Sequence, residues 1–250
     1  MTPPRTAPVL DVLVGPTGHG LPARLLSQDG VRLHPPARRG SIAALVEHLP
    51  PGRILLVDGR YDDVPAVGHR EILDAIAAGW QVTGLGSIGA LRAAELDGFG
   101  MSGYGRVFAH LRDSGAPDDE VALLHGPAPD YRPITEALVD LRAFAEHLAD
   151  AGVIGRAAAC DAVGALAGRW FGDRSLPALL HAVEATAGRS AAAAARTYLP
   201  RMPAIRWKSA DLTAYLTEQS WTRSPAPSRS CPRTAAAGPD STTVSTHSGC

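Results

Sequence analysis

The stretch RILLVDGRYDDVPAVGHREILDAIAAGWQVTGLGSIGALRAAELDG, residues 53–98, decides the fold class, because strand-like and helix-like patterns alternate along it. Short apolar runs at 53–59 and 80–84 are typical of buried strands. Apolar residues recur at helical spacing over 68–79 and 87–98, and both segments end at a glycine, which is a common helix exit. The stretch therefore predicts two consecutive strand–helix units.

The same alternation continues toward the N-terminus. VLDVLV (9–14) predicts a strand, and SIAALVEHL (41–49) predicts an amphipathic helix that Ser41 opens. Strands separated by helices and short turns indicate βαβ units, so we expect an α/β fold with a parallel, Rossmann-like sheet flanked by helices. Such sheets bind ligands beyond the carboxyl ends of their strands, which here are the turns at 15–20, 58–65 and 84–89.

The pattern changes after residue 101. GYGRVFAHLRDSG (103–115) and EALVDLRAFAEHLADAG (136–152) predict helices, whereas DDEVALLHGP (118–127) predicts a strand; the chain is then alanine-rich and helical to about residue 219. The tail is rich in Ser, Thr and Pro and too poor in apolar residues to order itself. We expect an α/β core domain at 1–150, a helical C-terminal region at 151–221 and a disordered tail at 222–250.

Composition narrows the class of protein. The chain has 250 residues, of which 45% are hydrophobic and 20% are charged, and its formal net charge is -1. These values fit a soluble globular protein and provide no basic field for nucleic acid. We find no signal-peptide pattern and no apolar segment of membrane-helix length, so we expect a cytoplasmic protein that binds neither nucleic acid nor membrane. Three cysteines without C-x-x-C spacing argue against a disulfide framework or structural zinc site.

Ser87 lies at the corner between a predicted strand and a predicted helix, within GLGSIG (84–89). A serine at this position is a good helix N-cap. The corner would equally suit an anion or oxyanion site, because backbone N–H groups at the start of a helix lack helical partners. A third role is a nucleophile on a sharp bend, although Leu85 replaces the first glycine of the G-x-S-x-G pattern. These three roles remain open.

Further chemical groups flank this corner. Arg92 and Glu95 are spaced to pair on a helix surface, and a partly buried guanidinium there would suit a carboxylate or phosphate. His69 usually would be structural, but its place after a strand end also suits a general base, with Asp58 or Glu71 as the orienting carboxylate. No set of histidines and carboxylates has metal-ligand spacing, so we expect neither a metal nor another cofactor.

The segment VGPTGHG (14–20) is a glycine-rich turn after a strand. It lacks both G-x-G-x-x-G and the G-K-[ST] ending of a P-loop, which argues against a nucleotide site. Its structural interpretation is a turn formed by Gly15 and Pro16, with Thr17 as a cap. Because carboxyl ends of parallel strands share one sheet edge, we expect the turns to gather four side chains there, those of Thr17, Asp58, His69 and Ser87.

Five segments carry a family resemblance: VGPT (14–17), PPARRG (35–40), DGRYDDVPAVGHREILDAIAAGWQVTGLGSIGALRAAEL (58–96), GMSGYGRVFAHLRDS (100–114) and DDEVALLHGP (118–127). Together they resemble the TfuA-like family over roughly residues 9–145. That family is associated with YcaO enzymes in forming thioamides on peptide backbones. The resemblance implies three partners, namely a YcaO cyclodehydratase, a thiocarboxylated ThiS-type sulfur carrier and a ribosomally made precursor peptide.

The resemblance also implies a reaction, the release of sulfide from the carrier's thiocarboxylate. This is acyl transfer to water and needs an anion-holding turn and a base. Arg92 would hold the carboxylate-like end, N–H groups around Gly86 and Ser87 would stabilise the oxyanion, and His69 would activate water or Ser87. We expect catalytic roles for Asp58, His69, Ser87, Arg92 and Glu95, and substrate contacts from Gly15, Pro16, Thr17, Gly59, Glu71, Gly86 and Gly89.

Two other hypotheses stay open. The chain could be a non-catalytic protein that docks the sulfur carrier or the peptide onto YcaO and leaves the chemistry to that enzyme. It could instead be an ordinary nucleotide-binding α/β domain, against which the missing phosphate fingerprints argue. Residues 1–159 contain no cysteine, which argues against a persulfide on the part of the chain that carries the resemblance.

Overall fold

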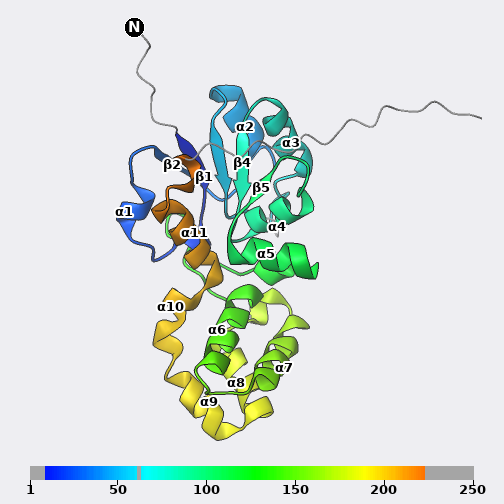
Figure 1. Ribbon diagram of the computed structural model, residues 1–250, viewed down its shortest axis with the longest axis vertical. Coiled ribbons are helices and arrows are strands. Elements are labelled where there is room, and N and C mark those ends of the chain that lie inside the picture. Colours follow the sequence, from blue (N-terminus) through cyan, green and yellow to red (C-terminus); the bar gives the residue numbers. More distant parts are fainter. Residues whose placement is uncertain (1–8, 61–62, 223–250) are drawn as a thin grey trace, which may run out of the picture.

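A parallel sheet of five strands forms the centre of the computed structural model, which describes residues 9–60 and 63–222. Its strands are β1 (Leu10–Leu13), β2 (Val31–His34), β3 (Arg53–Leu56), β4 (Gln81–Gly84) and β5 (Ser102–Gly103). They lie in the order β2-β1-β3-β4-β5 (Figure 1). The expectation of an α/β fold with a parallel sheet is confirmed.

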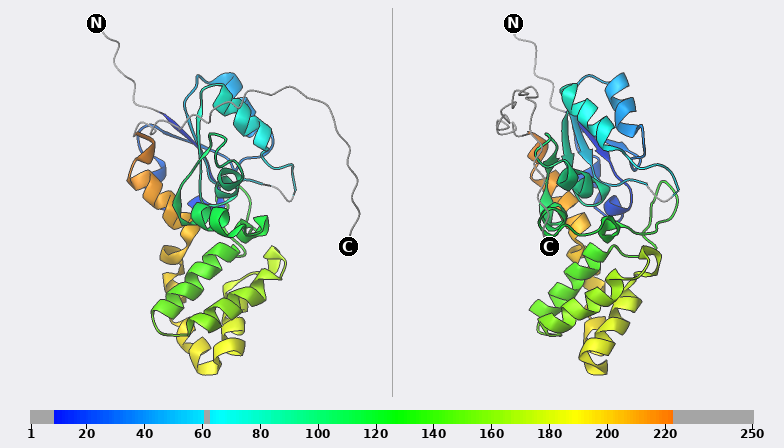
Figure 2. Two further views of the ribbon diagram at one scale, coloured as in Figure 1. Left: turned by 45° about the vertical axis from the view of Figure 1, so that its right-hand side comes forward. Right: turned by 90° about the vertical axis from the view of Figure 1, so that its right-hand side faces the viewer.

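Helices cover both faces of this sheet (Figure 2). On one face α2 (Ser41–His48) and α3 (His69–Ala77) pack on strand residues such as Ile54 and Leu56. On the other face α1 (Ala23–Leu26) and α11 (Trp207–Thr217) pack on residues such as Val12 and Leu55. Strands covered on both sides need apolar residues at consecutive positions, which explains runs such as Ile-Leu-Leu in β3.

The helix α4 (Ile88–Glu95) follows β4 and lies unusually close to the sheet. A Cβ atom on Gly89 would lie 1.8 Å from the backbone oxygen of Leu56, and one on Gly84 would lie 2.0 Å from the backbone oxygen of Gly89. Only glycine permits these approaches. They bring the start of α4 against the end of β3, and α4 then packs on α5 (Gly105–Ser114).

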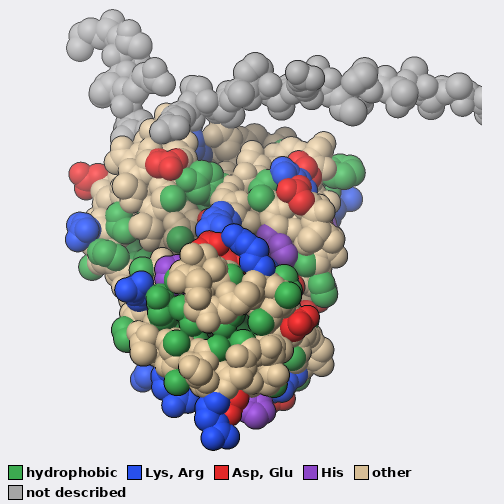
Figure 3. Space-filling model, turned by 60° about the horizontal axis from the view of Figure 1, so that its bottom comes forward, with side chains coloured by type: hydrophobic (Ala, Val, Ile, Leu, Met, Phe, Trp, Pro, Cys, Tyr) green, Lys and Arg blue, Asp and Glu red, His purple; other side chains and the backbone are tan. Residues whose placement is uncertain are grey.

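The C-terminal region expected at 151–221 is helical, and its core also includes residues of the preceding helix α6 (Leu138–Asp150). The chain continues through α7 (Arg156–Ala167), α8 (Leu176–Ala187), α9 (Arg189–Arg196) and the short α10 (Met202–Ile205). These helices share their own apolar core, and the chain then returns to the sheet as α11. Seen toward this helical end, basic and acidic side chains are interspersed (Figure 3). That face therefore offers no continuous basic surface.

A buried arginine ties the helical region to the α/β part. The side chain of Arg174 is fully buried. Its guanidinium donates to the backbone oxygens of Leu166 and Ala167 and to the backbone and carboxylate of Asp119. Leu166 and Ala167 belong to α7, and Asp119 lies in the segment after α5. The side chain of Arg174 therefore joins the helical region to the α/β part.

The prediction of a strand at 118–127 is wrong. Residues Asp118–Val121 form a 3₁₀ helix, η2, and the chain after it is a loop with one isolated bridge between His125 and Pro133. Val121 and Ala122 are apolar because they are buried against neighbouring elements. Such a short apolar run has no period that distinguishes a strand from packed loop.

The sequence analysis also differs from the structure at two short strands, and its expectation for the tail falls mostly outside the described residues. The strands β2 and β5 were not expected, since β2 is an edge strand with half of its residues exposed and β5 has only two residues. The tail expected to be disordered, 222–250, lies outside the described residues except for Thr222. Within the described part of the chain, no helix is long and apolar enough to cross a membrane.

Candidate functional site

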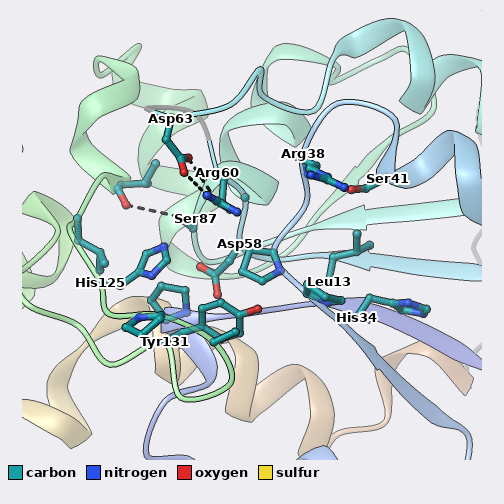
Figure 4. Close-up of a pocket in the computed structure, with 18 of the residues that line it drawn as sticks. Leu13, His34, Arg38, Ser41, Asp58, Arg60, Asp63, Ser87, His125 and Tyr131 are labelled. Atoms are coloured by element: carbon teal, nitrogen blue, oxygen red, sulfur yellow. Dashed lines mark hydrogen bonds and ion pairs between the residues drawn. The ribbon is translucent and has the colours of Figure 1, made fainter.

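A cavity of about 840 Å³ opens at the carboxyl ends of the strands. In the strand order β2-β1-β3-β4-β5, connections leave β1 and β3 in opposite directions, which creates a crevice between them. The cavity occupies this crevice, and loops after four strands line it with Pro16, Pro35, Asp58 and Ser87 among others (Figure 4). Three of the turns that the sequence singled out therefore meet there.

Asp58 organises the loop after β1. Its carboxylate accepts hydrogen bonds from the backbone N–H of Gly15 at 2.8 Å and of Thr17 at 2.9 Å, and from the Thr17 hydroxyl at 2.6 Å. Asp58 and Thr17 are both buried. The carboxylate of Asp58 therefore fixes the loop that places Pro16 on the cavity wall. Among the described residues, its hydrogen-bond partners are Gly15 and Thr17 and do not include His69.

Ser87 lies on the cavity wall and is only 6% exposed. It occupies the N-cap position of α4, but its side chain makes no capping hydrogen bond. The hydroxyl instead donates a long, 3.4 Å hydrogen bond to the backbone oxygen of Val121, and Gly86 beside it has a φ of +71°. The turn thus directs the hydroxyl toward the cavity-lining segment around Val121 and away from the helix end.

Lys208, at the start of α11, reaches the same carbonyl. Its Nζ donates to the Val121 oxygen at 3.0 Å, its side chain is almost wholly buried, and it lines the cavity. Its backbone N–H donates to the carboxylate of Asp140 at 3.1 Å. Burial raises the pKa of Asp140 to about 6. Sequence reasoning missed both residues, although Lys208 is the only lysine of the chain.

Basic and aromatic side chains surround the rest of the cavity. Arg38 and Arg39 come from the loop after β2, and Arg60 pairs with Asp63 across the loop after β3. The loop after η2 adds His125 and Tyr131, which lie near Asp58 in the close-up (Figure 4). A second cavity of about 540 Å³ adjoins the first, since His34, Pro35, Ala128 and Tyr131 line both.

His69, Arg92 and Glu95 form a separate cluster. The His69 Nε2 and the Arg92 Nη1 each lie 2.6 Å from one oxygen of Glu95, and Arg92 Nε donates to the Val67 oxygen at 3.0 Å. Burial alone would raise the pKa of Glu95, but hydrogen bonds from His69 and Arg92 lower it below its ordinary value. The predicted pairing of Arg92 with Glu95 is confirmed. None of the three residues lines the cavity.

Of the remaining residues expected to contact substrate, Gly59 lines the cavity and Glu71 holds the backbone of neighbouring helices. Gly59 lines the cavity, and a Cβ there would lie 3.0 Å from the Ala37 oxygen. Glu71 binds backbone, since its carboxylate accepts from Gly68 at 2.9 Å, Gly40 at 3.1 Å and Ile42 at 3.2 Å. It therefore joins the starts of α2 and α3. Within residues 9–60 and 63–222, no three His, Cys, Asp or Glu residues form a group that could hold a metal.

The fold and the crevice define the class: a doubly wound α/β protein with a site at the strand-order reversal and an added helical region. The family model described as TfuA-like protein matches residues 58–175. This match confirms the resemblance carried by the sequence and supports the assignment of the chain to the TfuA-like family. No curated protein matches the chain. The family match supports a role in the TfuA/YcaO-associated system.

Proposed function

We propose that this protein is an accessory protein for YcaO-dependent thioamide formation on a ribosomally made peptide. In this proposal it releases sulfide from a thiocarboxylated, ThiS-type sulfur carrier. The reaction is R–C(=O)S⁻ + H₂O → R–COO⁻ + H₂S, in which a C–S bond breaks and a C–O bond forms. The TfuA-like family match supports the association with the YcaO system, and the site supports the chemistry.

One observation carries the chemical part, namely the buried Ser87 hydroxyl on the wall of the crevice at the strand ends. Acyl transfer needs a nucleophile and a site for the oxyanion that develops on the acyl oxygen. The start of α4 supplies the positive end of a helix dipole, whereas the N–H groups of Ser87 and Gly89 already donate to the Leu85 and Val57 oxygens. A cavity of about 840 Å³ is within the usual range for a small-molecule site and is large enough for the end of a peptide chain.

In the serine route, the Ser87 oxygen attacks the thiocarboxylate carbon. The C–S bond breaks, sulfide leaves with the serine proton as HS⁻, and an acyl ester remains on Ser87. Water then hydrolyses the ester to the carboxylate and restores the hydroxyl, with release of one proton. Two imidazoles line the cavity and are the candidate bases: His34, whose Nε2 lies 2.6 Å from the Asp11 carboxylate, and His125, whose Nδ1 lies 2.7 Å from the Gly126 oxygen. His69 lies outside the cavity.

The test uses the purified full chain and a thiocarboxylated carrier, without YcaO. Sulfide is measured over time, and the carrier mass reports conversion of thiocarboxylate to carboxylate. Release that depends on Ser87, assayed with Ser87→Ala and with Glu95→Gln as the variant from the separate cluster, supports the proposal. An unchanged carrier after prolonged incubation with the wild-type protein would exclude hydrolysis by this protein alone.

Docking without chemistry is the second candidate, and the exposed surface favours it. Phe99, Ile134 and Trp170 are each more than half exposed, and large exposed apolar side chains often mark contacts with other proteins. In this alternative the protein binds the carrier or the precursor peptide and presents it to YcaO. Stable binding of the carrier with no sulfide release, and thioamide formation only after YcaO is added, would identify this role.

A further inference from the structure

All lysine and arginine positions of the chain except one are arginines. It contains 24 lysines and arginines, and the only lysine among them is Lys208. An arginine can replace a lysine at most exposed positions, where the charge alone matters. Lys208 is only 2% exposed and lies on the cavity wall. The only lysine ammonium group of the protein is therefore in its candidate site.

Burial of an ammonium group is costly unless a partner compensates the charge. Among the described residues, the Nζ of Lys208 makes one hydrogen bond, to the Val121 oxygen, and no ion pair with a carboxylate. Asp140 binds the backbone N–H of Lys208 and not its Nζ. An ammonium group has three N–H donors. Within the described structure, two of them are available to a ligand.

The position of this group relative to Ser87 suggests what the ligand is. The Ser87 hydroxyl and the Lys208 ammonium both donate to the Val121 oxygen, at 3.4 Å and 3.0 Å. The two groups therefore converge on one point of the cavity wall. An anion bound to the ammonium would lie beside the hydroxyl and near the start of α4, where an acyl group could be attacked.

We infer that Lys208 is the anion-binding residue of the cavity, and that its ammonium group holds the carboxylate or thiocarboxylate end of a ligand beside Ser87. The thiocarboxylate form of this inference rests on the proposed function. Lys208 takes the role that the sequence suggested for Arg92, whose guanidinium binds Val67 and Glu95 outside the cavity. Lys208 also lies outside residues 58–175, the segment that the family model matches.

A protein with one lysine allows a direct measurement. In protein labelled with ¹⁵N-lysine, the only side-chain ammonium signal of a lysine comes from Lys208. Acetate and thioacetate, the smallest carboxylate and thiocarboxylate, are titrated into the full chain. We expect both anions to shift this signal in a saturable way and, in a second sample labelled uniformly with ¹⁵N, to shift the backbone amide signal of Ser87 over the same concentrations.

Variants then assign the binding. Lys208→Met keeps an unbranched side chain that fits the buried position, and Arg70→Met removes an exposed positive charge elsewhere as the control. Loss of a buried charge partner should weaken acetate binding, followed at the Ser87 amide, roughly 30-fold or more. The control should bind as the wild type does. Thermal unfolding of each variant, and a Lys208→Gln protein if Lys208→Met does not fold, keeps folding and binding effects apart.

Each outcome decides a different statement. Equal acetate binding by wild type and Lys208→Met, or no saturable binding by the wild type, would overturn the inference about Lys208. Binding of both anions that depends on Lys208, without sulfide release from the carrier, would support the anion site and overturn the proposed hydrolysis. Lys208-dependent binding together with Ser87-dependent release would support both.

Discussion

The molecule has two clusters of chemically active side chains, and they differ mainly in burial. In the crevice, Ser87 and Lys208 are 6% and 2% exposed. In the surface cluster, the side chains of His69 and Glu95 are 49% and 36% exposed. A charge in a water-poor site acts on its neighbours much more strongly than the same charge in water. The surface cluster has the more regular hydrogen bonds, but the crevice is the better place for chemistry.

The clusters also differ in how they are assembled. The surface cluster joins the first turn of α3 to one face of α4, so it depends on two neighbouring helices. The crevice brings together residues that are far apart in the sequence, and Val121 and Lys208 are separated by 87 positions. A site of this kind exists only when the whole fold is correct. Changes in the crevice should therefore have larger effects than changes on the surface.

Replacing Asp58 should give the largest effect. Asp58→Ala would leave three buried donors without their acceptor, those of the Gly15 and Thr17 N–H groups and the Thr17 hydroxyl. We expect the free energy of unfolding to fall by about 3–5 kcal/mol. Urea unfolding measures the change. A loss below about 1 kcal/mol would mean that the loop after β1 does not depend on this carboxylate.

The buried carboxylate behind the crevice should give a pH-dependent effect. The pKa of Asp140 is raised from 3.8 to about 6, so between these pH values the folded protein keeps a proton that the unfolded chain loses. Stability should fall as the pH rises through this window. Asp140→Asn removes this dependence and keeps an acceptor for the Lys208 N–H.

Urea unfolding at several pH values tests the expectation for Asp140. The variant should match the wild type below about pH 4 and be more stable by up to about 3 kcal/mol above about pH 6. Other carboxylates titrate in both proteins, so their contributions cancel in the difference between wild type and variant. The charges of Glu136, Arg206 and Lys208 act on Asp140 and contribute to its pKa in the wild type. A variant less stable than the wild type at neutral pH would show that the ionised carboxylate stabilises the fold.

Ser87→Ala should affect chemistry more than folding. The hydroxyl makes one long hydrogen bond and no helix cap, so we expect a stability loss below about 1 kcal/mol. If the hydroxyl attacks or stabilises the reacting acyl group, sulfide release should fall about a hundredfold or more. Sulfide release and thermal unfolding are measured on the same samples. Unimpaired release would remove Ser87 from the proposed chemistry.

Glu95→Gln should have the smallest effect. Glu95 is half-buried and pairs with exposed His69, and pairs at the surface contribute at most about 1 kcal/mol. Because the pKa of Glu95 is lowered, its contribution exists above the unfolded pKa and disappears as the pH falls through the folded pKa. Wild type and variant should therefore converge in acid. A large loss of sulfide release with unchanged stability would place the chemistry at the surface cluster instead.

The fold was predictable where the information is local. Over 53–98 each strand and helix has its own pattern, and the structure has β3, α3, β4 and α4 there. The edge strand β2 escaped notice because its residues are not consistently apolar. The segment 118–127 was assigned wrongly because its apolar residues are buried in a loop and a 3₁₀ helix. Local patterns do not show what buries a residue.

The site was predictable only in part, for the same reason. Parallel strands place their carboxyl ends together, so the sequence could indicate that Asp58 and Ser87 line one cavity and that Thr17, bonded to Asp58, lies beside it. It could not place His69 outside the cavity, since that depends on how α3 lies against α4. Lys208 gave a signal in composition, as the only lysine, but its position beside Ser87 depends on the return of α11 to the sheet.

The path of the chain through the helical region has a consequence for its length. The chain leaves the α/β part at Glu136 and returns at Arg206, and these two residues form an ion pair with each other. The segment between them, from α6 to α10, thus behaves as an insertion whose two ends are fastened together. A change of length at the turn between α8 and α9, away from this ion pair and from the contact of Arg174 with Asp119, should therefore leave Lys208 in place.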